Sequence, residues 1–391
     1  MAIKITTHNL PHPGAYISPN IAAEASLFLT YTPDFEMLGN FREKYKHKKK
    51  LIHIANGGSL SSFYAFYHSF LDVSEKQVYF VNTLDPDYIA YLRNICDTEE
   101  TLVVTVSKSG ENTSQVEGTL QFSDYEMLLV TAPGSYLEAV GKAKGWNILT
   151  HPSIGGRYTG LTEVNLLSAA LCGFNVQEIF LGGREVQKSF YEENDIYKLA
   201  RSMNILEQQG FVDCIVPIYS KFFCDYYLLL AQLCHESFGK GGKGQTYIGF
   251  EAPEAQHHTT QRLYGGTRSM AAFFVGFESS ASELITTVGR EIAELPYKSA
   301  TLKALDGISL QEAMRFEMQA NIDEASELKV PTAEIWLERR TYRSAGEFLA
   351  FWQLYAIYSS IVREVNPFDQ PEVEHSKKLS FESRLRYKQP K

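Results

Sequence analysis

The sequence has no apolar run of the roughly twenty residues that a membrane-spanning helix requires. Its opening segment, MAIKITTHNLPHPG, also lacks the apolar core of a signal peptide. Basic residues are not in excess, because 37 Lys and Arg stand against 46 Asp and Glu, which gives a net charge of -9. We therefore expect neither a membrane nor a nucleic acid as a partner of this chain.

Cysteines are few and none forms a CxxC pair; the five are Cys96, Cys172, Cys214, Cys224 and Cys234. This pattern predicts reduced thiols and a cytoplasmic protein. There is no HExxH motif or cysteine cluster, and His235, His257 and His258 lack the spacing of metal ligands, so we expect no metal site. The glycine spacing of the dinucleotide fingerprint and the GK[ST] end of the Walker loop are also missing.

Strand-like runs alternate with helix-like runs along the 391 residues, of which 44% are hydrophobic and 21% charged. This alternation is typical of α/β folds with parallel sheets. The length suits two domains, 1–185 and 186–365, followed by a C-terminal tail over 366–391. The predicted strands are 50–55, 78–82, 101–106, 127–132, 146–150, 211–219, 245–251, 270–277 and 331–337.

Helices are expected between these strands. A helical bridge is predicted over 177–204, and Ser309 with Glu312 has the spacing of a capping box. The segment 344–364 reads as a long amphipathic helix that ends before Asn366-Pro367. The last segment, 371–388, reads as a polar helix.

Hydroxyl-bearing turns follow two of the predicted strands, in LIHIANGGSLSS (51–62) and TLVVTVSKSGENTS (101–114). The carboxyl ends of parallel strands meet at one edge of a sheet, where ligands bind. Backbone N–H groups, hydroxyls and a following helix N-terminus together form an anion site, usually for phosphate. We expect a sugar phosphate there; the predicted binding residues are Gly58, Ser59, Ser107, Lys108, Ser109 and Thr113.

A carboxylate stands near the end of the apolar segment KFFCDYYLLLAQLCHESF (221–238). Gln232 and Glu236 are four residues apart, so they share one face of a helix. Glu236 lies at the end of a buried helix, beside the glycine-rich GKGGKG (239–244), which is a suitable setting for a general base. The alternative is an ordinary solvated helix end.

Histidine and arginine candidates lie in two further segments. In EAQHHTTQ (254–261), His257 and His258 are expected in the first turn of a helix, whose positive end favours the neutral ring and thus proton exchange. The alternative is that they cap or pack. In SIGGRYTG (153–160), Arg157 projects from a glycine turn, where it can stabilise an anionic intermediate or form a structural salt bridge.

The segment NPFDQPEVEHSKK (366–378) is expected to turn into a helix. Gln370 and Lys377 are its candidate polar contacts, and surface exposure is the alternative for Lys377.

In combination, these segments resemble blocks of the glucose-6-phosphate isomerase family, whose members are built from two sugar-isomerase (SIS) domains. SIGGRYTG resembles the family's GGR[FY]S signature, and NPFDQPEVEHSK resembles its C-terminal signature. QLCHESFGK resembles the block of the catalytic glutamate, and EAQHHTTQ resembles the GQH block. The resemblance extends over nearly the whole chain.

The resemblance implies two doubly wound, three-layer αβα domains and an isomerase of glycolysis and gluconeogenesis. It implies that glucose 6-phosphate and fructose 6-phosphate are interconverted through a cis-enediolate, without a cofactor. By position, Glu236 matches the base that moves a proton between C1 and C2, and Arg157 matches the cation that stabilises the enediolate. The other matches are Gln232 beside the base, His257 and Lys377 for ring opening, and Gln370 at the sugar. Since the family's histidine comes from the partner subunit, the resemblance implies a homodimer.

The chain departs from the family pattern at four places. SKSGENTS holds one residue more than the usual SKSGxT turn, which affects the position of Thr113. GGSLSS lacks the aspartate that often follows GGS, and Thr159 replaces a serine. His258 stands beside His257, although Gln256 favours His257 as the match. Two alternatives stay open: an isomerase that also accepts mannose 6-phosphate, and a non-catalytic SIS protein that senses a sugar phosphate.

Overall fold

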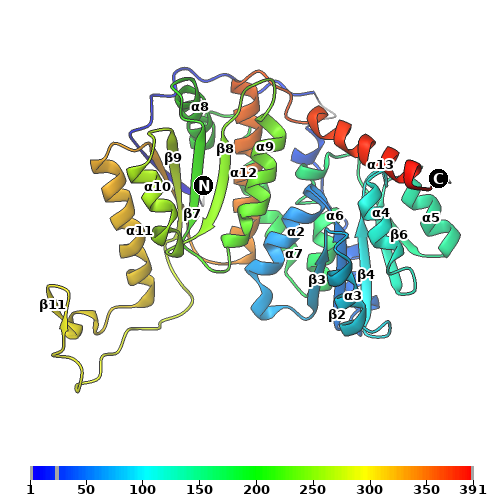
Figure 1. Ribbon diagram of the computed structural model, residues 1–391, viewed down its shortest axis with the longest axis horizontal. Coiled ribbons are helices and arrows are strands. Elements are labelled where there is room, and N and C mark those ends of the chain that lie inside the picture. Colours follow the sequence, from blue (N-terminus) through cyan, green and yellow to red (C-terminus); the bar gives the residue numbers. More distant parts are fainter. Residues whose placement is uncertain (1–2, 23–25, 389–391) are drawn as a thin grey trace.

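Two five-stranded sheets lie side by side in the computed structural model, which describes residues 3–22 and 26–388 (Figure 1). The strands are β1 (Lys4–His8), β2 (Lys50–Ala55), β3 (Gln77–Val81), β4 (Thr101–Val106), β5 (Glu126–Thr131), β6 (Asn147–Thr150), β7 (Asp213–Ile218), β8 (Thr246–Glu251), β9 (Met270–Phe277), β10 (Pro296–Tyr297), β11 (Ala300–Thr301) and β12 (Thr332–Leu337). The α-helices are α1 (Phe35–Lys44), α2 (Gly58–Ser69), α3 (Pro86–Ile95), α4 (Thr113–Leu120), α5 (Tyr136–Lys144), α6 (Glu163–Leu171), α7 (Val176–Gln187), α8 (Asp195–Gln208), α9 (Tyr227–Phe238), α10 (Thr259–Gly265), α11 (Leu310–Glu327), α12 (Tyr342–Val362) and α13 (Glu374–Lys388). The short 3-10 helices are η1 (Leu27–Leu29), η2 (Leu71–Val73), η3 (Gly156–Tyr158), η4 (Cys224–Tyr226), η5 (Glu254–His257), η6 (Leu302–Leu305) and η7 (Pro371–Val373).

The first sheet is entirely parallel and has the strand order β3-β2-β4-β5-β6. All six residues of β4 and five of the six in β2 are buried, as expected for strands covered on both faces. Ala55 at the end of β2 pairs with Val106 at the end of β4. The two hydroxyl-bearing turns are therefore neighbours at the carboxyl edge of this sheet.

The second sheet has the order β1-β12-β9-β7-β8. Its strands β12, β9, β7 and β8 are parallel, whereas β1 pairs with β12 in the antiparallel direction. The sequence did not predict β1, because KITTH is short, largely exposed and far along the chain from its partner strand. Helices with parallel sheets confirm the predicted α/β class.

The helix α12 lies between the two sheets, beside α2, α7 and α9 (Figure 1). It was predicted to be amphipathic, but the prediction is wrong, because every residue from Ser344 to Ser360 is buried. Its surroundings explain this, since α7, α8 and α9 all pack against it. One apolar cluster accordingly contains residues of both sheets and of α12.

Most predicted elements occur within one or two residues of their expected bounds. The bridge predicted over 177–204 is two helices, α7 and α8, and the helix predicted over 221–238 begins as α9 only at Tyr227, after η4. Ser309 caps α11, because its hydroxyl accepts a hydrogen bond from the backbone N–H of Glu312 at 3.1 Å. The domain boundary near residue 185 stays a proposal.

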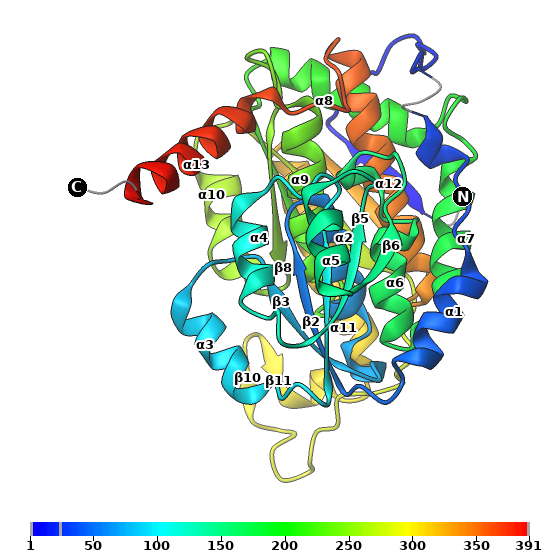
Figure 2. The ribbon, with the colours of Figure 1, turned by 90° about the vertical axis from the view of Figure 1, so that its right-hand side faces the viewer.

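Two segments project from the body formed by the sheets. Residues 279–309, between β9 and α11, form an arm that carries the small β10–β11 hairpin (Figure 1). At the C-terminus, α13 projects outward from the body and has no buried residue (Figure 2). A bidentate ion pair between Arg384 and Glu117, at 2.7 and 2.6 Å, connects α13 to α4.

Candidate active site

A carboxylate from α9 and a guanidinium from η3 meet at the centre of the candidate site. Glu236 is in the last turn of α9, and Arg157 is in η3, which follows β6 of the first sheet. The Arg157 Nη1 donates to Glu236 Oε2 at 3.0 Å. The Arg157 side chain is 5% exposed and that of Glu236 is 31% exposed, so the carboxylate faces solvent from a pair whose cation is buried.

The remaining donors of Arg157 hold the turn before the C-terminal helix. Nη1 donates to Gln370 Oε1 at 2.9 Å, and Nη2 donates to the carbonyl oxygens of Pro367 and Asp369 at 2.6 and 2.8 Å. Nε donates to the Ser237 hydroxyl at 3.0 Å. Arg157 therefore brings Glu236 and Gln370 together, although the three residues are far apart in the sequence.

Lys240 also binds the turn 366–370. Its Nζ donates to the carbonyl oxygen of Asp369 at 2.6 Å, to Asp369 Oδ1 at 2.5 Å, and to the carbonyl oxygen of Asn366. This pairing lowers the pKa of Asp369 below its ordinary value. The turn 366–370 is thus bound to two buried cations.

Gln232 connects the carboxylate to the first hydroxyl-bearing turn. Its Nε2 donates to Glu236 Oε1 at 3.3 Å, and its Oε1 accepts from the Ser61 hydroxyl at 2.7 Å. A Cβ atom on Gly57 would lie 2.8 Å from Gln232 Nε2. The predicted pair of Gln232 and Glu236 on one helix face is therefore present, and it lies against the start of α2.

The start of α2 also touches the turn that carries Arg157. A Cβ atom on Gly58 would lie 2.2 Å from the backbone nitrogen of Arg157, so only glycine allows this approach. Asn165 in α6 strengthens the contact, because its Nδ2 donates to Thr159 Oγ1 at 3.1 Å and to the carbonyl oxygen of Gly58 at 3.4 Å.

The predicted phosphate-binding residues lie in the two neighbouring turns. Ser59 is in the first turn of α2, and Ser107 directly follows β4; both are buried. Lys108 and Ser109 are exposed in the loop, and Thr113 is the first residue of α4. Gln115 joins the ends of the two strands, since its Nε2 donates to the carbonyl oxygens of Ile54, at 3.3 Å, and Val106. This edge offers hydroxyls, a lysine and the N-termini of α2 and α4 to an anion.

His151 lies at the same edge, after β6. It is buried, and burial lowers the pKa of its imidazole to about 4, with a smaller contribution from Lys108. Its Nδ1 is 2.7 Å from the carbonyl oxygen of Pro152. A neutral, buried imidazole therefore lies next to the hydroxyl-bearing turn that follows β4.

His257 is not near Glu236 within one chain. It is exposed at the end of η5, which follows the carboxyl end of β8. Glu236 lies at the opposite end of that strand, because its neighbour His235 accepts a hydrogen bond from the N–H of Tyr247 at the start of β8, at 2.9 Å. The six residues of β8 span about 20 Å. The helix expected in this segment is the 3-10 helix η5, which begins at Glu254 and contains His257, whereas His258 follows it and α10 begins at Thr259.

Lys377 is exposed on α13, where its Nζ pairs with Glu374 at 2.7 Å. It makes no contact with the cluster of Arg157, Glu236 and Gln370 in the described part of the chain. Of the residues predicted to be catalytic, the structure therefore joins Glu236 and Arg157, and it leaves His257 and Lys377 apart from them.

Several supporting residues were missed by the sequence analysis: Ser61, Gln115, Asn165, Ser237 and Lys240. Three of them lie in segments that the sequence analysis singled out: Ser237 and Lys240 in QLCHESFGK, and Ser61 in LIHIANGGSLSS. The others depend on contacts between segments that are distant in the sequence.

Among residues 3–22 and 26–388, no three or more His, Cys, Asp or Glu side chains are placed to bind one metal ion. In the same part of the chain, no helix has the length and apolarity needed to cross a bilayer.

No protein-family model matches the chain. A glucose-6-phosphate isomerase of Borreliella afzelii is 27% identical to it over 380 residues, covering 88% of this chain and 70% of the relative. The crystal structure of a glucose-6-phosphate isomerase from Chlamydia trachomatis superimposes with a TM-score of 0.79 at 20% identity, covering 98% of this chain and 82% of that one. A hypothetical protein from Thermus thermophilus gives a TM-score of 0.83 at 22% identity, covering 93% and 90% of the two chains. The predicted resemblance is thereby confirmed along most of the chain.

Proposed function

We propose that this protein, a homologue of glucose-6-phosphate isomerases over most of its length, interconverts glucose 6-phosphate and fructose 6-phosphate. The observation that carries the proposal is the pair of Glu236 and Arg157, held 3.0 Å apart beside the hydroxyl-bearing turns. A proton-transferring carboxylate and a fixed cation are the two groups that an aldose–ketose isomerisation requires. The reaction belongs to glycolysis and gluconeogenesis.

The phosphate binds at the turns after β2 and β4. The hydroxyls of Ser59, Ser107, Ser109 and Thr113, with Gly58 and Lys108, hold it away from the reacting carbons. Binding energy from this remote group orients C1 and C2 of the open sugar against Glu236. Gln232, which touches both the turn and the carboxylate, fixes the distance between the two parts of the site.

Glu236 takes the proton from C2 of the aldose and returns it to C1 of the ketose. As the proton leaves, negative charge develops on the oxygens of the enediolate, and the Arg157 guanidinium stabilises it; losing such a donor typically costs about 3–4 kcal/mol of transition-state stabilisation. Gln370 binds a sugar hydroxyl from the turn that Arg157 and Lys240 hold. The carbon-bound proton moves from C2 to C1 and the hydroxyl proton moves from O2 to O1, so the oxidation level of the whole molecule is unchanged and the step needs no cofactor.

A homodimer supplies the ring-opening group. Within one protomer His257 and Glu236 are at opposite ends of β8, which supports a site completed by His257 of the partner subunit. Together with Lys377 it moves a proton from the C1 hydroxyl to the ring oxygen. Lys377 reaches the site by a shift of α13, which is joined to the first domain by the pair of Arg384 and Glu117.

Two other functions are less well supported. An isomerase that also accepts mannose 6-phosphate would need the same residues with more room at C2, and no relative named above carries that activity in its name. A sugar-phosphate sensor would need the turns but not the buried pair of Arg157 and Glu236. The five cysteines are free thiols in this structure, which supports a reducing compartment such as the cytoplasm.

The test is the conversion of fructose 6-phosphate to glucose 6-phosphate by the wild type and by Glu236→Gln. Because general acid–base catalysis contributes about 10²–10⁴-fold, we expect kcat to fall by at least that factor while fructose 6-phosphate still binds. Glu185→Gln on the surface of α7 is the matched control and keeps wild-type activity. A near-normal kcat for Glu236→Gln would falsify the assignment of the base.

A further inference from the structure

The two sheets repeat the same arrangement of strands. The order β3-β2-β4-β5 in the first sheet corresponds to β8-β7-β9-β12 in the second. In both sheets, the chain first adds a strand on one side of the starting strand (β3 beside β2, β8 beside β7). It then adds the next strands on the other side (β4 and β5, or β9 and β12). The pair β7 and β9 therefore occupies the position that β2 and β4 occupy in the first sheet. At such a reversal, ligands bind beyond the carboxyl ends of the strands.

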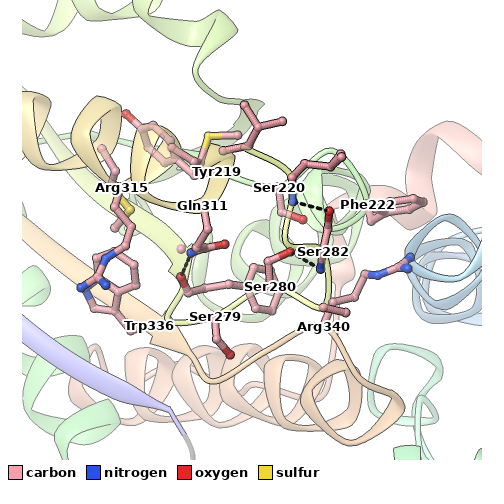
Figure 3. A pocket seen from close by; sticks show the side chains of 17 residues that line it. Tyr219, Ser220, Phe222, Ser279, Ser280, Ser282, Gln311, Arg315, Trp336 and Arg340 are labelled. Carbon is pink, nitrogen blue, oxygen red and sulfur yellow. Dashed lines mark hydrogen bonds between the residues drawn. The ribbon is translucent and has the colours of Figure 1, made fainter. Parts of the chain in front are cut away.

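The corresponding turns of the second sheet also carry hydroxyls. Ser220 follows β7, and Ser279, Ser280 and Ser282 follow β9. Together they line a cavity of about 390 Å³ at the carboxyl edge of the sheet (Figure 3). This is within the range of small-molecule sites, about 300–1,000 Å³. The second sheet thus repeats both the position and the chemistry of the proposed phosphate turns.

Three of these serines have a hydroxyl proton that no described side chain or carbonyl accepts. Ser220, Ser280 and Ser282 each accept a hydrogen bond from a backbone N–H, at 3.3, 3.0 and 3.3 Å, respectively. A hydroxyl that accepts in this way can still donate. Ser279 differs, because its hydroxyl donates to the carbonyl oxygen of Glu338 at 3.0 Å.

The opposite side of the cavity is apolar and carries a cation. Figure 3 shows Trp336 and Arg315 across the cavity from Ser220 and Ser282. The Arg315 guanidinium lies 5.8 Å from the centre of the Trp336 ring and makes only a 3.3 Å contact with exposed Glu312. Arg340, at the other end, is already neutralised by a bidentate pair with Asp72 at 2.8 Å. Arg315 is therefore the cation available to a ligand.

We propose that this cavity is a second site for a phosphorylated sugar, separate from the candidate active site. The serine hydroxyls and Arg315 bind its polar groups, and Trp336 packs against the apolar face of the sugar ring. The two sites are at opposite edges of the second sheet, since Glu236 lies near the amino end of β8. The proposal concerns binding alone and does not depend on the proposed isomerase activity.

The test is a calorimetric titration of the full chain with 6-phosphogluconate, which has no carbonyl to isomerise. We expect Ser220→Ala/Ser282→Ala to bind one equivalent per chain fewer than the wild type. The matched control, Ser299→Ala, removes an exposed serine of the arm outside the cavity and keeps wild-type stoichiometry.

Arg315→Gln is a second test variant. Its side chain is half-exposed, so the substitution tests the site even if the double serine variant does not fold. It is expected to weaken the second site by about tenfold or more through loss of a charged hydrogen bond. Turnover of fructose 6-phosphate is measured in parallel and stays unchanged in both variants. Equal stoichiometry in wild type and the serine double variant, or equal affinities in wild type and Arg315→Gln, would overturn the proposal. If the active site itself failed to bind this sugar, the wild type would bind one equivalent and the double variant none.

Discussion

Replacement of Lys240 by methionine tests whether the turn 366–370 positions the candidate active site. The Lys240 side chain is 8% exposed, and methionine preserves most of its apolar stem while removing the charge. Three acceptors lose the donor that Lys240 supplies: the carbonyl oxygens of Asn366 and Asp369, and the Asp369 carboxylate. Asp369 keeps hydrogen bonds from Arg157 Nη2 to its carbonyl oxygen, at 2.8 Å, and from Asn366 Nδ2 to its carboxylate, at 3.0 Å. Lys240 touches none of the groups assigned to proton transfer, so an effect on turnover has to pass through the turn.

The size of the effect follows from the exposure of the partners. Breaking a fully buried ion pair costs about 3–5 kcal/mol, because an unpaired charge stays buried. Asp369 is 52% exposed, so water replaces its lost partner, and the lower range for charged hydrogen bonds, about 1.5–3 kcal/mol, applies to the free energy of unfolding. If the same energy is lost from the placement of Gln370 and Arg157 in the transition state, kcat falls by about ten- to a hundredfold.

Two measurements check this expectation: urea unfolding, and steady-state turnover of fructose 6-phosphate. The matched control is Lys243→Met in the same loop, whose Nζ donates to the carbonyl oxygen of Arg363 at 2.6 Å and not to the turn. It is expected to lose stability without a comparable loss of kcat. Because Lys240 lowers the pKa of Asp369, the stability gap between wild type and Lys240→Met narrows as acid protonates Asp369. A Lys240→Met variant with wild-type kcat would refute the positioning role.

Three further predictions concern other parts of the molecule. Gly58→Ala puts a Cβ atom 2.2 Å from the backbone of Arg157, so we expect a loss of about 1–3 kcal/mol in urea unfolding together with reduced kcat, whereas Gly39→Ala, where no atom lies within 4 Å, loses neither. Mixing subunits of His257→Gln with subunits of Glu236→Gln is expected to restore turnover, because each hybrid dimer has one site with both groups intact; if His257 served its own chain, mixing would restore nothing. Burial raises the pKa of Glu347 from 4.5 to about 7, so its stabilising contribution is complete below pH 4.5 and is lost as the pH rises through 7. Glu347→Gln is accordingly expected to raise the unfolding free energy at about pH 8 by up to about 3 kcal/mol and to leave it unchanged at about pH 4; equal gains at both pH values would contradict this reasoning.

Much of the fold could be predicted because its signals are local. Buried parallel strands appear as continuous apolar runs, as in β2, β4 and β9. The nine predicted strands lie within a few residues of their observed bounds. The strand β1 and the arm 279–309 were missed for the converse reason. A short polar strand and a long loop have no periodicity of their own, and β1 is defined only by its pairing with β12.

The candidate site was also predictable only in part: its local features could be read from the sequence, but its tertiary contacts could not. The spacing of Gln232 and Glu236 placed them on one helix face, and the ends of β2 and β4 placed the hydroxyl turns at one edge. The joining of Arg157, Glu236 and Gln370 was not contained in any local pattern. It arises from tertiary contacts: α12 packs against α9, Gln353 of α12 donates to the carbonyl oxygen of Arg157 at 3.3 Å, and the Arg157 side chain binds the turn 366–370.

The sequence by itself determined which residues could perform proton transfer and where each lies in its own strand, helix or turn, since side-chain chemistry and helical or strand periodicity are local properties. Only the tertiary structure decided which of them meet. It paired Glu236 with Arg157, left His257 at the far end of β8, and buried all sides of α12, because these outcomes depend on contacts between segments distant in the sequence.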